Sequence, residues 1–234
     1  QLISTGTKFR TGTDTEVLLN GIQRWGLEST LHKLEGMFAF ALIDLNEGVL
    51  YLVRDRIGEK PLYYGWQNGV FLFGSELAAM RQHPKWAGGT DKFAMSEMLQ
   101  LGYVPLEGTI HPNVYKVPAG GMISVALLGH EIGKVKHRRW WSYQDCVQKN
   151  YGYYSGMDAL EIEHQVDMVL RQVVSDQNVA DVPIGAFLSG GIDSSLVVAY
   201  MQEISSQPIR TFSLGFENPG YSEIDVAEKV AHEL

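Results

Sequence analysis

The chain has 234 residues, of which 45% are hydrophobic and 20% are charged, as is usual for a globular protein. At about 100–200 residues per domain, this length predicts one or two domains. The formal net charge of −8 argues against nucleic acid or an anionic membrane as a partner, because both require an excess of Lys and Arg.

Cysteine content and hydropathy predict a cytoplasmic protein. The single cysteine, Cys146, forms no internal disulfide and lies in a polar stretch without metal-binding neighbours, so we expect no function for it. The longest apolar runs are far shorter than the ~20 residues of a membrane helix, and no signal peptide is visible. Because the chain opens without methionine and closes on an unfinished helical pattern, we expect a segment of a longer protein.

The first half changes from helical to strand-like patterns. Thr13 and Glu16 have the spacing of a capping box, so a helix is expected from there to Gly26, followed by a second short helix. Four short aromatic and β-branched runs come next, and their uniform apolarity predicts a sheet covered on both faces. Asn68-Gly69, between the last two runs, predicts a two-residue hairpin turn.

A helix near 92–101 and a strand at 121–127 complete the first half. The stretch 138–156 is polar and aromatic without a clean period, so we expect a linker there. It would separate a first domain, 1–137, from a second, 157–234.

The second domain alternates helical and strand patterns. The expected elements are an amphipathic helix at 157–174, a strand at 184–188, a helix at 194–204, a strand at 211–216 and a helix from about Ser222. This alternation is the signature of an α/β fold with parallel strands and right-handed crossovers.

The segment Ser189–Ser195, SGGIDSS, lies between the first of these strands and its helix. Ligands of parallel sheets bind beyond the carboxyl ends of the strands, where this segment lies. Gly190 and Gly191 leave backbone N–H groups open to an anion, the following helix directs its positive end there, and serine hydroxyls add donors. Asp193 would repel a phosphate, so its expected role is to hold a Mg²⁺ ion that bridges phosphate oxygens.

This loop differs from other glycine-containing site motifs. It lacks the lysine of GxxxxGK[ST], and it matches neither GxGxxG nor GxSxG. A purely structural interpretation stays open at this point. In it, the glycines serve only a tight turn between strand and helix, and Asp193 only caps the helix.

Several segments resemble known families. "LSGGIDSS" is similar to the pyrophosphate loop of ATP pyrophosphatases, which adenylate a carboxylate and release pyrophosphate. The upstream half resembles the glutaminase domain that accompanies this loop in glutamine-dependent asparagine synthetases. The matching segments, in order, are GTDTE at 12–16, LEGMFAFALID at 34–44, RDRIGEKPLYYG at 54–65, GSELAAM at 74–80 and VPAGGMI at 117–123. The resemblance implies an α/β and α+β chain: a partial αββα sandwich of the N-terminal-nucleophile type, then the start of a parallel-sheet ATP-pyrophosphatase domain.

The resemblance also assigns roles to residues. Asp14 matches the aspartate that binds the α-amino group of glutamine, although such a carboxylate is ordinarily a helix cap. Met37 matches a residue of the tunnel that carries ammonia between the two sites, although such a methionine is ordinarily in the core. The residues matching the ATP and pyrophosphate site are Leu188, Ser189, Gly190, Gly191, Asp193, Ser194 and Leu214. A further set matches the glutaminase scaffold and is expected to be structural: Arg54, Asp55, Gly58, Pro61, Ser75 and Glu76.

The nucleophile of the family is absent from this chain. In the family it is an N-terminal cysteine whose own α-amine acts as base, whereas Gln1 opens this chain and Cys146 lies beyond the glutaminase pattern. The upstream asparagine and glycine that would stabilise the oxyanion are absent too. We therefore expect no catalytic residue in this segment and no turnover by the segment alone.

The resemblance implies a reaction for the longer protein. Glutamine is hydrolysed to ammonia, and ATP with Mg²⁺ converts aspartate through an aspartyl adenylate to asparagine, AMP and pyrophosphate. The expected partners are the small molecules glutamine, aspartate and ATP, and a homodimer is left open. One alternative is an amidotransferase of the same architecture that acts on another carboxylate, such as a cell-surface sugar acid or an antibiotic precursor. The other is a non-catalytic nucleotide-binding module.

Overall fold

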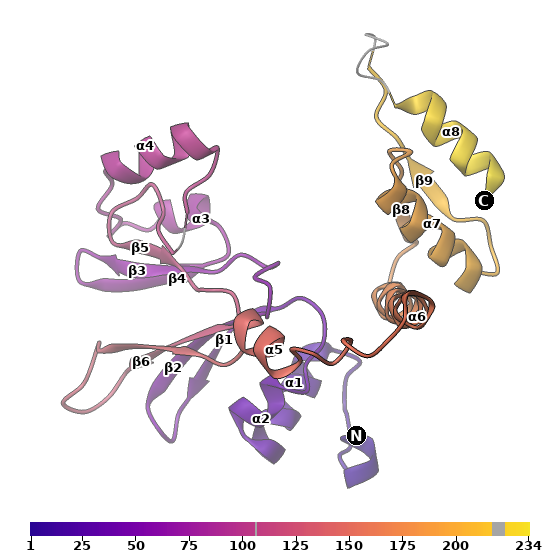
Figure 1. Cartoon of the computed structure of the whole chain (residues 1–234). Helices are drawn as coiled ribbons and strands as arrows, with labels where there is room; N and C mark the ends of the chain where they lie inside the picture. The colour runs from indigo at the N-terminus through magenta and orange to yellow at the C-terminus, as the bar shows by residue number, and fades with distance from the viewer. Residues whose placement is uncertain (106, 217–222) are drawn as a thin grey trace. The chain divides into compact units, whose positions relative to one another are not determined.

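A computed structural model of the chain describes residues 1–105, 107–216 and 223–234 (Figure 1). They form two compact units, Gln1–Asn150 and Tyr151–Leu234. Each unit has a hydrophobic core of its own.

Unit 1 (Gln1–Asn150) is built from two antiparallel sheets and short helices. Its helical elements are η1 (Ile3–Thr5), α1 (Asp14–Trp25), α2 (Leu27–Leu31), α3 (Leu77–Arg81), α4 (Lys92–Leu101) and α5 (Tyr143–Lys149). Its strands are β1 (Ala39–Asp44), β2 (Val49–Arg54), β3 (Tyr63–Gln67), β4 (Val70–Gly74), β5 (Val114–Lys116), β6 (Gly121–Ala126) and β7 (Val135–Arg139). One sheet has the order β1-β2-β6-β7 and the other the order β4-β3-β5.

The two sheets of unit 1 pack face to face, and helices cover their outer faces. Successive side chains of β2 point to opposite faces of its sheet. Leu52 shares a core with Tyr64 of the second sheet, whereas Val53 shares another with Leu31 of α2. A third cluster joins β4 to α3. The layers therefore follow the predicted order helix, sheet, sheet, helix, and the first sheet is covered on both faces as expected.

Asn68 and Gly69 form the predicted turn between β3 and β4. Both residues have positive φ values, 44° and 80°, and Gln67 pairs with Val70 across the turn. Positive φ at both central residues is typical of a type I′ turn, whose twist matches that of the flanking strands. Other elements were not predicted: β5 has only three residues, and β7 is polar and exposed, so neither shows an apolar run.

α1 begins after Thr13 as predicted, but its capping box is only half formed. The Thr13 hydroxyl accepts the N–H of Glu16 at 3.4 Å. The Glu16 carboxylate instead accepts the N–H groups of Arg10 and Thr11, at 2.9 and 2.7 Å, and the Thr11 hydroxyl. The Thr11 hydroxyl, followed by these N–H groups, lowers the pKa of Glu16. Glu16 thus fixes the loop that leads into α1.

Unit 2 (Tyr151–Leu234) alternates helices and strands. Its described elements are α6 (Ala159–Gln177), β8 (Gly185–Phe187), α7 (Ile192–Ile204), β9 (Arg210–Phe212) and α8 (Ile224–Glu233). β8 and β9 pair in parallel, with Ala186 opposite Thr211. Leu188, Val198 and Ala227 form the core that joins β8, α7 and α8. The parallel pair and its helices confirm the α/β organisation expected for this part of the chain.

Helix ends in unit 2 differ from the predicted ones. α7 begins two residues before the expected Ser194, because Gly191 adopts the extended conformation of an N-cap and Ile192 is already helical. α6 ends at Gln177, ahead of the proline at position 183. The predicted start of the last helix at Ser222 lies outside the described residues.

The division between the units falls inside the stretch expected as a linker. Of that stretch, 138–156, the end of β7 and the whole of α5 belong to unit 1. The domain limits 1–137 and 157–234 stay a prediction.

Candidate functional site

A cavity of about 490 Å³ opens in unit 1 beside the starts of α1 and β1 and the turn before β3. Its lining includes the charged residues Asp14, Glu35 and Lys60 and the apolar residues Met37, Phe38 and Phe40. The structure therefore brings Asp14 and Met37, both singled out from the sequence, to one cavity.

Asp14 is the first residue of α1 and is exposed. The N-cap is Thr13, so Asp14 does not cap the helix. Its Oδ1 accepts the N–H of Thr15 at 2.7 Å, and no donor among the described residues reaches its Oδ2. A carboxylate in the first helical turn is stabilised in its charged form by the helix dipole. Asp14 thus offers the cavity a carboxylate oxygen for a positively charged group.

The buried side chain of Asp55 joins two walls of this cavity. The Asp55 carboxylate accepts the N–H groups of Gly58, Glu59 and Lys60, at 2.6, 2.9 and 3.0 Å. It also accepts the N–H of Phe38, which precedes β1, at 3.3 Å. Burial alone would raise the pKa of Asp55, but the four N–H groups outweigh burial and lower it. One carboxylate therefore holds the turn before β3 against the start of β1.

Arg54 holds the same turn from its other side. Its Nε donates to the carbonyl of Lys60 at 2.7 Å, and its Nη2 donates to that of Gly58 at 2.6 Å. Its Nη1 donates to the carbonyl of Val117 at 2.8 Å. These three carbonyls engage all the nitrogens of the guanidinium, which supports the structural role expected for Arg54.

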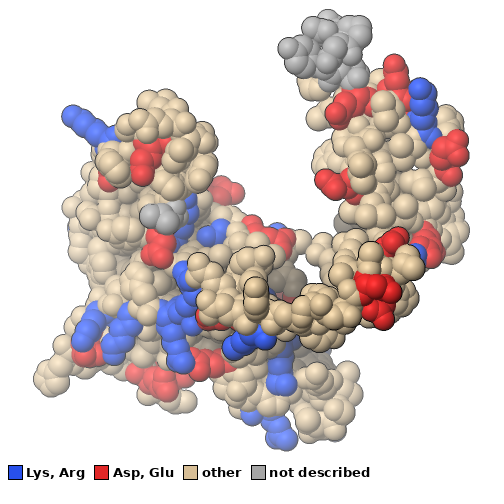
Figure 2. All heavy atoms as spheres, viewed as in Figure 1, with Lys and Arg blue, Asp and Glu red and all other residues tan. Residues whose placement is uncertain are grey.

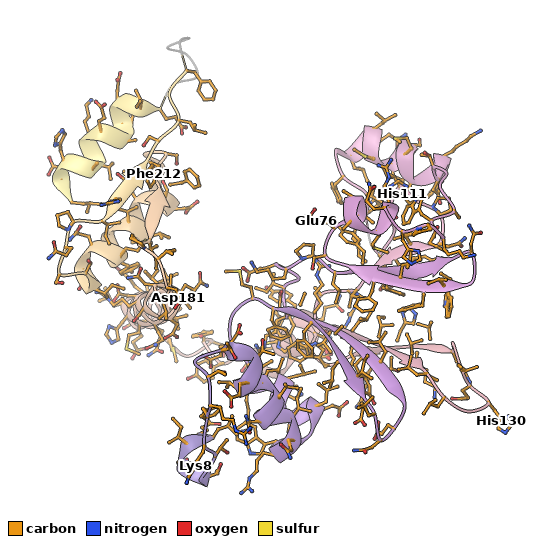
Figure 3. All side chains as sticks on the ribbon, turned by 180° about the vertical axis from the view of Figure 1, so that it is seen from behind. Lys8, Glu76, His111, His130, Asp181 and Phe212 are labelled. Carbon is orange, nitrogen blue, oxygen red and sulfur yellow. The ribbon has the colours of Figure 1, made fainter. Side chains whose placement is uncertain are left out.

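Met37 and two residues of the expected scaffold also line this cavity. Met37 is 53% exposed, so it is not a core methionine, and its role in an ammonia path stays a prediction. Pro61 and Ser75 line the cavity. Glu76, labelled in Figure 3, is the N-cap residue of α3 and makes no capping hydrogen bond with its side chain.

In unit 2, serine hydroxyls organise the loop at the start of α7. The hydroxyls of Ser189 and Ser194 lie 3.0 Å apart, and Ser194 Oγ accepts the N–H of Ser189 at 3.3 Å. The Ser195 hydroxyl donates to the carbonyl of Gly191 at 2.7 Å. The N-cap, Gly191, has no side chain to cap α7. Because the first N–H groups of a helix have no acceptor within it, this end of α7 offers them to an anion.

The two glycines of the loop meet different surroundings. Gly190 has a φ of +80°, and a Cβ there would lie 2.9 Å from both Ala227 N and Val226 Cγ1 of α8. Gly191 has a negative φ, and a Cβ there would meet only Ser189 Oγ at 3.4 Å. Gly190 is thus required by the close approach of α8, whereas Gly191 keeps the start of α7 open.

A second cavity, of about 300 Å³, lies beside this loop at the carboxyl ends of β8 and β9. Its apolar lining includes Leu188, Leu214, Phe216 and Phe212, which is labelled in Figure 3, and its polar lining consists of Ser189, Ser213 and Glu223. This is the edge of a parallel sheet at which ligands bind.

Leu188 and Leu214, expected beside a nucleotide, differ in their surroundings. Leu188 is buried, donates its N–H to Phe212 at 2.9 Å and accepts the Ser213 hydroxyl on its carbonyl at 2.6 Å. Leu214 is 76% exposed at the cavity. Contact of their backbone groups with a nucleotide stays a prediction.

Asp193 is the second residue of α7, two positions after the N-cap residue Gly191, and is exposed. Within the described residues, no cluster of three or more His, Cys, Asp or Glu side chains could enclose a metal ion. Mg²⁺ is typically bound by one or two carboxylates together with substrate phosphates and waters. A single carboxylate beside the N-terminus of a helix fits that ion, and the binding of Mg²⁺ by Asp193 stays a prediction.

Among the described residues, Cys146, the surface charges and the helix lengths indicate no further site. Cys146 lies exposed on α5, outside both cavities. Figure 2 shows Lys and Arg interspersed with Asp and Glu on the visible face of unit 1. In the part of the chain that the structure describes, every helix is too short or too polar to cross a membrane.

Comparison with known families assigns both units. Residues 1–141 match the family model of the glutamine amidotransferase domain. The chain belongs to this family. Residues 165–234 match the model of asparagine synthase, so the amidotransferase domain is followed by a segment of that second family.

Curated relatives contain both parts. The chain is 34% identical to asparagine synthetase [glutamine-hydrolyzing] 1 of Bacillus subtilis, over 100% of this chain and 35% of that protein. It is 35% identical to the putative asparagine synthetase [glutamine-hydrolyzing] 2 of Methanocaldococcus jannaschii, over 88% of this chain and 39% of that protein. The chain thus spans little more than a third of the length of these relatives. A solved glutamine phosphoribosylpyrophosphate amidotransferase from B. subtilis aligns with 94% of this chain and 43% of its own, at 20% identity and a TM-score of 0.41, which is too low to bear on the fold.

Some residues at the two cavities were missed by sequence reasoning. Glu35 and Lys60 of the amidotransferase domain lie inside resembling segments but have no spacing of their own that marks a site. Ser213 follows β9 directly, at the strand end where ligands bind, and that position could have identified it.

Proposed function

We propose that the chain carries the glutamine site and the nucleotide site of a glutamine-dependent asparagine synthetase. The observation that carries the proposal is the presence, in one chain, of an amidotransferase domain and a hydroxyl-lined glycine loop at the uncapped start of α7. The proposal is supported by relatives named asparagine synthetase, whose alignments cover 100% and 88% of this chain.

In the first unit, Asp14 binds the α-ammonium group of glutamine. Its Oδ2 supplies the opposite charge, and the apolar walls of the cavity at Met37 and Phe38 suit the methylene groups of the substrate. Hydrolysis of the side-chain amide gives glutamate and ammonia. The nucleophile and base of that step are assigned to no residue of this chain.

In the second unit, the loop Ser189–Ser194 binds the phosphates of ATP through hydroxyls and the N–H groups of α7. A carboxylate oxygen of aspartate attacks the α-phosphorus, the bond to the bridging oxygen breaks, and pyrophosphate leaves with the electron pair. Ammonia then attacks the acyl carbon of the adenylate, AMP leaves, and loss of a proton from nitrogen gives asparagine. Asp193 would hold a Mg²⁺ ion, which would reduce repulsion among the phosphate oxygens.

The Asp14→Asn variant tests the glutamine site. We expect it to bind L-glutamine about 10- to 100-fold more weakly than the wild type, because a hydrogen bond between charged groups loses its charge on one side. Asparagine still accepts the N–H of Thr15, so the start of α1 is retained. Isothermal titration calorimetry of the 234-residue chain with L-glutamine measures the effect.

The control for this variant is Thr13→Ala. It removes the N-cap of α1 and about 1 kcal/mol of helix stability without changing the lining of the cavity. Its affinity for glutamine should equal that of the wild type. Equal losses in the two variants would show that Asp14 acts only through the helix.

The Asp193→Asn variant tests the expected metal site. In the presence of Mg²⁺ we expect its affinity for ATP to fall about tenfold or more, because it loses the charged metal ligand. With EDTA, the variant should bind ATP at least as tightly as the wild type, because the uncompensated carboxylate that repels the phosphates is gone. Asp225→Asn, in the first turn of α8, is the matched control and should retain the response to Mg²⁺. A loss of the same size without Mg²⁺ would assign Asp193 to the folding of the loop.

A further inference from the structure

Glu223 has no role in the sites described so far. It lines the cavity of unit 2, where the other described lining residues are apolar or carry hydroxyls. It is also the N-cap residue of α8, but its side chain makes no capping hydrogen bond. The carboxylate is exposed and is the one charge at the cavity among the described lining residues.

Glu223 lines the same cavity as Ser189 of the serine–glycine loop, and it immediately precedes α8, which approaches that loop. Gly190 of the loop is so close to α8 that a Cβ on it would lie 2.9 Å from atoms of Val226 and Ala227. Val226 follows Glu223 by less than one helical turn. Glu223 therefore lies near the point where the loop meets the cavity.

This position corresponds to one part of a bound nucleotide. If the phosphates lie on the loop and the base lies against the apolar lining at Leu214 and Phe216, the ribose lies at the junction. An ionised carboxylate only accepts hydrogen bonds, and it repels phosphate. The ribose hydroxyls are the donors that a nucleotide presents there.

We propose, on the basis of the function proposed above, that Glu223 accepts hydrogen bonds from the ribose hydroxyls of ATP. Carboxylates perform this task in other nucleotide-binding α/β folds, where an acidic side chain binds the ribose. Glu223 is then a specificity-determining residue: it distinguishes ribonucleotides from their deoxy analogues and contributes nothing to the binding of pyrophosphate.

The test compares three ligands by isothermal titration calorimetry on the 234-residue chain with Mg²⁺: ATP, 2′,3′-dideoxy-ATP and pyrophosphate. We expect the wild type to bind ATP about 10- to 100-fold more tightly than the dideoxy analogue, the range for hydrogen bonds to a charged group. In Glu223→Ala the two affinities should become equal. The affinity of this variant for pyrophosphate should match that of the wild type, which also shows that its loop is folded.

The matched control is Asp225→Ala, which removes a carboxylate from the same helical turn but not from the cavity lining. It should retain the preference for ATP. The inference is overturned if Glu223→Ala retains that preference in full, or if the wild type binds all three ligands without distinguishing ATP from its analogue. Failure of the wild type to bind both ATP and pyrophosphate would overturn the proposed nucleotide site itself, and this inference with it.

Discussion

The Asp55→Ala variant is expected to lower the free energy of unfolding of unit 1 by about 2–4 kcal/mol, because four backbone N–H groups lose the one charged, buried acceptor that holds them together. Asp55 is 1% exposed and accepts four backbone N–H groups, from the turn before β3 and from Phe38. Urea unfolding followed by tryptophan fluorescence measures the change. All 5 tryptophans lie in unit 1, and Trp140 is in its core, so this signal reports unit 1 alone.

Asp44→Ala is the matched control for this variant. Asp44 also accepts two backbone N–H groups, from Asn46 and Glu47 at 2.9 and 3.0 Å, but in the turn between β1 and β2 that faces solvent. Water can replace the lost acceptor there, so we expect a loss of about 1 kcal/mol. An Asp55→Ala effect no larger than this would contradict the role assigned to the buried Asp55 carboxylate.

The stabilisation by Asp55 should also depend on pH. Its folded-state pKa is lowered, so its contribution is complete above the unfolded pKa of about 3.9 and is lost as pH falls through the lower folded value. Below about pH 4, the unfolding free energy of the wild type should therefore fall more steeply than that of Asp55→Asn. Parallel curves for the two proteins between pH 3 and pH 7 would contradict the shift.

The Gly190→Ala variant is expected to destabilise unit 2 by about 2–4 kcal/mol, through strain at positive φ and overpacking against α8. The added Cβ would lie 2.9 Å from the backbone nitrogen of Ala227, which cannot move without displacing α8. Unit 2 has no tryptophan, so hydrogen exchange of α7 and α8 amides, read by mass spectrometry, is the measurement. Both helices should exchange faster than in the wild type.

Gly191→Ala provides the comparison within the same loop. Its φ of −70° suits alanine, and its Cβ would meet only the Ser189 hydroxyl at 3.4 Å. Replacing an N-cap glycine with alanine should cost about 1 kcal/mol or less. If the amides of α7 and α8 exchange at the same rates in the two variants, the close packing of Gly190 against α8 does not stabilise unit 2.

Local patterns predicted much of the fold. Apolar runs identified β1 to β4 and β6, and Asn68-Gly69 predicted its turn because the required positive φ values are a property of those two residues. β7 escaped prediction because its residues are polar, and pairing with β6 rather than an apolar face defines it as a strand. Glu16 satisfied the spacing of a capping box, but the Arg10 and Thr11 N–H groups compete for its carboxylate.

The candidate sites were less accessible to sequence reasoning. The resemblance identified Asp14 and Met37, but only the folded structure shows that the start of α1 and the segment before β1 line one cavity. The glycine pair predicted that the backbone N–H groups at Gly190 are open to an anion. The structure shows instead that Gly190 lacks a side chain because α8, more than thirty positions along the chain, packs against it. Glu223 showed no motif at all, because its position at the cavity depends on where α8 packs.

The turn at Asn68 and Gly69 has a consequence for the kinetics of folding. It joins strands that are adjacent in sequence, and such hairpins form in about 1–10 μs. By contrast, two other strand pairs join residues that are far apart in the sequence. β3 pairs with β5, where Gly65 lies opposite Val114, and β2 pairs with β6, where Val53 lies opposite Met122. Closing those segments costs chain entropy before any contact compensates for it. We therefore expect the β3–β4 hairpin to form early, and the arrival of β5 and β6 to set the folding rate of unit 1.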